Sequence, residues 1–114
     1  MEKIKNINLT KVKKFLQQEK RVIFAYLFGS FAQKKVRPFS DIDIALFLER
    51  ELTPEQIVAA KKEIYSHLVD ILGTEYLDLV ILNQASLPLA ARVLQSKKIL
   101  VDQNPFLRHQ YESL

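Results

Sequence analysis

An apolar strand that leads into a Gly-Ser turn and then a pair of alternating aspartates constrains this chain more than any other feature. Residues 22–28 are almost entirely apolar and are followed directly by Gly29 and Ser30, while Asp41 and Asp43 alternate with aliphatic residues further on. Side chains alternate between the two faces of a sheet, so both carboxylates are expected on one face. Neighbouring carboxylates raise one another's pKa, and oxygen anions are the ligands that Mg2+ prefers. The pattern therefore predicts a cation site at this end of the sheet.

This segment resembles the signature of the polymerase-beta-like nucleotidyltransferases, Gly-Ser-x-Ala followed by Ser-Asp-x-Asp, which residues 29–32 and 40–43 match in order. The small size is similar to that of the minimal nucleotidyltransferases, the antitoxin halves of HEPN–MNT toxin–antitoxin pairs. Members of that family carry a third carboxylate on a later strand, and Asp78 fits that place. The resemblance covers about residues 22–102, although Lys34 stands where relatives usually have a second glycine.

The resemblance implies a set of site residues. Asp41, Asp43 and Asp78 would be the catalytic residues and would hold a pair of Mg2+ ions. The turn would contact the phosphates of a nucleotide through its backbone and a hydroxyl group. The residues expected to bind the nucleotide are Gly29, Ser30 and Ser40.

The resemblance also implies a reaction and a partner. The chain would transfer AMP from ATP to a protein acceptor, a tyrosine of a cognate HEPN ribonuclease toxin, and so act as an antitoxin. Related small-molecule transferases hold their acceptor with an extra helical domain, for which we expect no room here. Two alternatives stay open: an antitoxin with a weak site that neutralises its partner by binding, and a small-molecule nucleotidyltransferase that acts as an oligomer. The assembly would be a homo-oligomer or a hetero-oligomer with the toxin.

Ser30 has a second interpretation, as the nucleophile of a hydrolase. That motif needs glycine two residues before and two residues after the serine. Phe28 and Ala32 occupy those positions, so the spacing excludes the hydrolase elbow.

Composition limits the remaining classes of function. At 114 residues the chain is expected to form one domain, residues 1–114, with a core over about 22–102. It has no cysteine, which is compatible with a reducing cytoplasm, and no apolar run that would predict a membrane span. Its net charge is +4, but aromatic residues do not interleave with the basic ones, so nucleic-acid binding is not favoured. The basic residues Lys34, Lys35 and Arg37 are either a guide for an anionic nucleotide or acidic partner, or a solvated loop.

Periodicity and capping signals predict an α/β (α+β) fold with a small mixed sheet flanked by helices. We expect helices mainly on one face of the sheet, with the carboxylate face open at one end. The C-terminal helix, about residues 105–114, carries Leu107, Tyr111 and Leu114 on one face, which would either fold onto the core or dock a partner. The predicted strands are 22–28, 41–47, 76–82 and 99–101, and the other predicted helices are 8–19, 30–34, 53–72 and 87–95.

Overall fold

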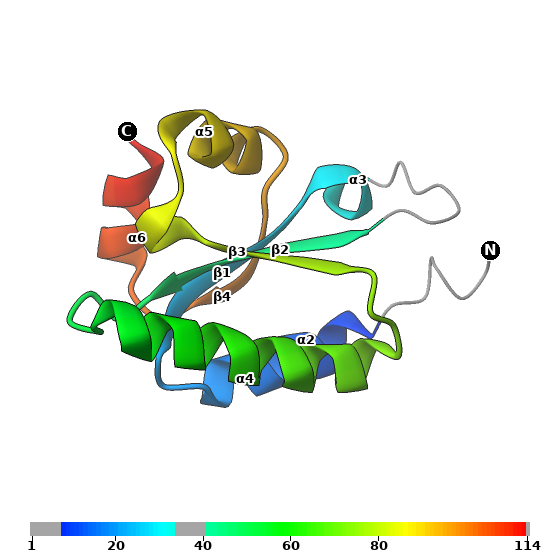
Figure 1. Cartoon of the computed structure of the whole chain (residues 1–114). Helices are drawn as coiled ribbons and strands as arrows, with labels where there is room; N and C mark the ends of the chain where they lie inside the picture. The colour runs from blue at the N-terminus through cyan, green and yellow to red at the C-terminus, as the bar shows by residue number, and fades with distance from the viewer. Residues whose placement is uncertain (1–7, 34–40, 114) are drawn as a thin grey trace.

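The computed structural model describes residues 8–33 and 41–113, which form a mixed sheet with helices on both faces (Figure 1). The order of elements and the α/β class agree with the sequence-based prediction. The elements are α2 (Leu9–Gln18), β1 (Val22–Phe28), α3 (Gly29–Ala32), β2 (Ile42–Leu48), α4 (Pro54–Leu72), β3 (Leu77–Ile81), η1 (Leu82–Gln84), α5 (Leu87–Gln95), β4 (Lys98–Asp102) and α6 (Pro105–Glu112).

The four strands lie in the order β3-β2-β1-β4. β1 is antiparallel to both β2 and β4, whereas β2 and β3 are parallel. A parallel pair needs a crossover connection, and α4 provides it. The crossover places the first residues of β2 and β3 side by side at one end of the sheet.

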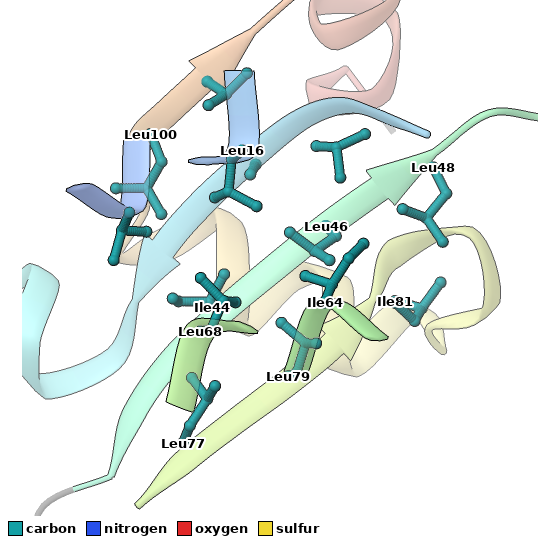
Figure 2. Packing of buried hydrophobic residues seen from close by; sticks show 14 of the residues in the cluster. Leu16, Ile44, Leu46, Leu48, Ile64, Leu68, Leu77, Leu79, Ile81 and Leu100 are labelled. Atoms are coloured by element: carbon teal, nitrogen blue, oxygen red, sulfur yellow. The ribbon is translucent and has the colours of Figure 1, made fainter. Parts of the chain in front are cut away.

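The main core lies between the sheet and the helices α2 and α4. Ile44 and Leu46 of β2 project toward Ile64 and Leu68 of α4, while Leu16 of α2 packs beside them (Figure 2). All five side chains are fully buried. Because these residues alternate with Asp43 and Ala45 along β2, their burial turns the acidic side chain to the opposite face.

The opposite face is also covered, by α5 and α6, which corrects the expectation that helices pack mainly on one face. The rings of Phe24 and Phe47 are stacked with centroids 4.7 Å apart, and Tyr111 of α6 lies 5.5 Å from Phe47. β1 is buried along its whole length, so its aromatic face needs a cover of its own. Leu107 and Tyr111 therefore fold onto the core, while Leu114 lies outside the described residues.

α4 begins and ends where its sequence predicts. Thr53 and Gln56 form a capping box at its start, and Gly73 ends it in the left-handed conformation at φ 69°. At 19 residues α4 is the longest helix of the described chain. Neither it nor any other described helix is both long enough and apolar enough to cross a membrane.

Candidate active site

The aspartates predicted from the sequence meet at the end of the sheet where β2 and β3 begin. Asp43 lies directly opposite Asp78 in the parallel ladder. Neighbouring strands are about 4.8 Å apart, so these two residues are adjacent across the ladder. Asp41 comes just before β2 and is exposed, as is Asp78, whereas Asp43 is half-buried. We call these three residues the aspartate site.

Gly29 lies against the aspartate site, at the point where β1 ends. Phe28 pairs with Asp43 across the antiparallel ladder, and Gly29 follows it with φ 72°. A Cβ atom on Gly29 would overlap the Asp43 Oδ2 atom and lie 3.2 Å from Asp43 Cγ. Both the backbone angle and the space therefore require glycine here. The close approach that the structure describes is to a carboxylate, and the predicted contact of Gly29 with phosphate stays a prediction.

The aspartate site concentrates negative charge. Burial, and then the charges of Asp78 and Asp41, raise the pKa of Asp43 to about 6, while Arg92 opposes this rise with a smaller effect. The alternating pattern predicts such an effect of like charges on a neighbouring carboxyl group. A site of this kind favours a cation between its carboxylates.

The three carboxylates do not form a complete metal site by themselves. Within residues 8–33 and 41–113, no three acidic, histidine or cysteine side chains are grouped so that they could hold a metal ion. This arrangement still fits Mg2+, which is commonly bound by one or two carboxylates together with water and substrate phosphates. The half-buried, charge-crowded Asp43 and its ladder partner Asp78 are oxygen donors of that kind.

Two residues that the sequence analysis missed lie beside the turn. The Gly29 amide donates a hydrogen bond of 2.9 Å to the Ser96 Oγ atom, which follows α5. Arg92, one turn earlier, is the cation that lowers the pKa of Asp43. Their i, i+4 spacing places both on one face of a helix, which is the signal that could have found them.

The other predicted site residues fall into two groups, of which the structure describes one. Ser30 is partly buried and is the second residue of the short α3, next to the aspartate site. Ser40 and the basic residues Lys34, Lys35 and Arg37 lie outside the described residues.

Comparison with known proteins defines the class to which this fold and site belong. The chain is a member of the polymerase beta nucleotidyltransferase family, whose family model matches residues 10–106. No curated protein matches the chain.

Solved structures of toxin–antitoxin pairs resemble this chain. A chain of a toxin–antitoxin crystal structure with AMP-PNP superimposes with a TM-score of 0.74 and 28% identity, over 94% of this chain and 82% of that one. A chain of an MntA–HepT toxin–antitoxin structure gives a TM-score of 0.67 and 26% identity, over 92% and 78%. A third structure holds a tri-AMPylated Shewanella oneidensis HEPN toxin in complex with an MNT antitoxin, at a TM-score of 0.65 and 25% identity, over 98% and 81%. The resemblance to the minimal nucleotidyltransferases of MNT–HEPN pairs is thereby confirmed.

Proposed function

We propose that this protein is an antitoxin that transfers AMP from ATP to a tyrosine of a HEPN ribonuclease toxin. The observation that carries the proposal is that Asp43, Asp78 and the Gly29 turn lie together at one end of the sheet. The chain that holds them belongs to the polymerase beta nucleotidyltransferase family. The AMP-PNP in one structural neighbour and the AMPylated toxin in another support ATP as the substrate and a toxin as the acceptor. The cytoplasm stays the predicted location.

In this proposal Asp41, Asp43 and Asp78 hold Mg2+ together with the phosphates of the nucleotide. Bound there, the metal would offset phosphate charge and lower the pKa of the acceptor hydroxyl group. Ser30 would donate its hydroxyl proton to a β- or γ-phosphate oxygen. Because the turn lies beside the carboxylates, it would hold the triphosphate next to them.

The reaction exchanges one phosphorus–oxygen bond for another. The tyrosine oxygen attacks the α-phosphorus in line, the bond between the α-phosphorus and the bridging oxygen breaks, and pyrophosphate leaves with the electron pair. The tyrosine proton passes to the surrounding water. AMP remains on the toxin as a phosphodiester.

Intact-mass spectrometry of the partner tests this proposal. With ATP and Mg2+, the wild-type chain should add multiples of one AMP to the toxin, and Asp78→Asn should abolish the addition. Asp70→Asn is the matched control, because Asp70 is an exposed acid of α4, the helix that packs on the sheet face opposite to Asp43.

The outcomes separate the proposal from its rival. A folded Asp78→Asn chain that still adds AMP would remove Asp78 from the site. If the wild-type chain neutralises the toxin without changing its mass, the protein acts by contact alone and the enzymatic proposal is wrong.

A further inference from the structure

The C-terminal end of α5 is joined to the Gly-Ser turn, although the two segments are far apart in the sequence. The hydrogen bond from the Gly29 amide to Ser96 Oγ connects residues 67 positions apart. The same hydroxyl group donates a longer hydrogen bond of 3.5 Å to the Arg92 carbonyl oxygen. The C-terminal end of α5 therefore lies beside the turn that borders the aspartate site.

Arg92 places a positive charge in the last turn of α5. Its side chain is exposed, and none of the described carboxylates lies within ion-pair distance of it. Its charge nonetheless acts on Asp43 of the aspartate site. The neighbouring Lys97 differs, because its charge acts on Glu112 of α6. Arg92 precedes Ser96 by one helical turn, so the hydrogen bond that joins Ser96 to Gly29 places Arg92 at the end of α5 that lies beside the Gly-Ser turn.

We propose that Arg92 binds the β- and γ-phosphates of the nucleotide and the pyrophosphate that they become. The inference rests on the proposed function, in which the neighbouring turn holds the triphosphate. A guanidinium group donates paired hydrogen bonds to phosphate oxygens in a fixed geometry. Ser96 is a positioning residue that keeps the turn against α5, so that Arg92 and Ser30 face the same phosphates.

Binding of ATP and of AMP to the same variants tests the proposal, since AMP lacks the β- and γ-phosphates. Calorimetry in the presence of Mg2+ should show that Arg92→Gln weakens ATP binding about tenfold or more, the effect of losing one charge-assisted contact. AMP binding should change less than about twofold. Arg92→Lys should recover part of the ATP affinity because it keeps the charge, and Lys97→Gln should leave ATP binding unchanged.

Thermal melting of each variant distinguishes phosphate binding from a structural role, since a cation in the last turn of a helix also stabilises that helix. Equal loss of ATP and AMP binding, with a lower melting temperature, would overturn the inference in favour of the structural role. ATP binding within about twofold of wild type in Arg92→Gln would also overturn it. If the wild-type chain binds no ATP, the proposed function itself fails. This outcome is distinguishable from failure of the Arg92 inference, because it is measured on the wild-type chain without any variant.

Discussion

The sheet face that carries Asp43 has acidic side chains at both of its ends, in opposite surroundings. At the aspartate site, burial and then the charges of Asp78 and Asp41 raise the pKa of Asp43. At the other end, Arg108 binds Asp102 at 2.7 Å and Glu112 at 3.0 Å. We call the second group, with Tyr26, the α6 network. Like charges therefore act on one another at the aspartate site, whereas opposite charges are paired in the α6 network.

The pairing in the α6 network lowers a pKa instead of raising it. The Tyr26 hydroxyl group donates a hydrogen bond of 2.6 Å to Glu112. Burial raises the pKa of Glu112, but this hydrogen bond and the Arg108 ion pair outweigh it and leave that pKa below its usual range. A carboxylate that gains partners on folding stabilises the fold, whereas one crowded by like charges costs stability. The comparison indicates that the α6 network stabilises the fold, whereas the crowded carboxylates of the aspartate site do not.

The largest expected effect comes from removing two carboxylates of the aspartate site. Asp41→Asn together with Asp43→Asn should weaken Mg-ATP binding by at least about a hundredfold, because metal–phosphate contacts are worth several kcal/mol. Calorimetry should also show that Mg2+ and ATP each bind more weakly alone than together, since the triphosphate completes the set of metal ligands.

A matched control uses two acids near the opposite end of β2. Glu49→Gln together with Glu51→Gln removes the same charge from exposed residues and should leave Mg-ATP binding unchanged. Unaltered affinity in the aspartate double variant would remove the metal assignment.

The next largest effect comes from removing the cation of the α6 network. Arg108→Met would leave Asp102 and Glu112, each 19% exposed in their side chains, without their cation. Removing one partner of such a partly buried pair should lower the free energy of unfolding by about 2–3 kcal/mol. Urea denaturation measures this loss, and ATP binding should stay within about twofold of wild type.

Arg50→Met is the control for that variant, because Arg50 is exposed beyond the end of β2. It should change the unfolding free energy by less than about 0.5 kcal/mol. Equal losses in the two variants would show that the α6 network contributes nothing specific to stability.

Local signals predicted the elements that hold the aspartate site. The apolar run 22–28 became β1 with the predicted bounds, and Thr53, Pro54 and Gly73 marked the two ends of α4. These succeed because helix caps and strand periodicity depend on residues close in sequence. The face on which Asp43 and Asp78 lie also follows from the sequence, because the aliphatic residues that alternate with them are buried on the other face.

Contacts between distant segments could not be predicted in the same way. In the sequence, Ser96 is only the residue that ends a predicted helix. Its hydrogen bond with Gly29 depends on the sheet, which brings the two distant segments together. The stripe of Leu107 and Tyr111 suited either a core or a partner, and the aromatic face of β1 decided it.

A smaller effect is expected from substituting the two glycines with positive φ. Gly29 and Gly73 have φ of 72° and 69°, but only Gly29 has Asp43 where a Cβ atom would lie. Gly73→Ala should cost about 1 kcal/mol of stability from backbone strain and leave ATP binding intact. Gly29→Ala should cost more, about 2 kcal/mol, and also weaken ATP binding, because Asp43 must move. Equal effects on ATP binding would show that the packing of Gly29 against Asp43 is unimportant.

The smallest effect concerns the stability cost of the crowded charges. The pKa of Asp43 is about 6 in the folded chain against an ordinary value of 3.8. A raised acid pKa means that the folded state binds more protons between these values, so stability falls as the pH rises through them. Above pH 6 the cost is complete, and it amounts to about 1 kcal/mol once solvent screening of this half-exposed group is allowed for. Asp43→Asn should therefore raise the melting temperature of the metal-free protein at pH 7.5.

That gain should disappear below about pH 3.8, where the carboxyl group is neutral in both states. Glu112→Gln should behave in the opposite way, with a loss of stability at neutral pH that shrinks as the pH falls, because the folded pKa of Glu112 is lowered. At saturating Mg-ATP the wild type should have a higher melting temperature than Asp43→Asn, because a ligand stabilises only the chain that binds it. Melting curves across pH measure all three. A loss of stability in metal-free Asp43→Asn at pH 7.5 would mean that Asp43 is paired in the fold, and the two ends of this face would then not differ.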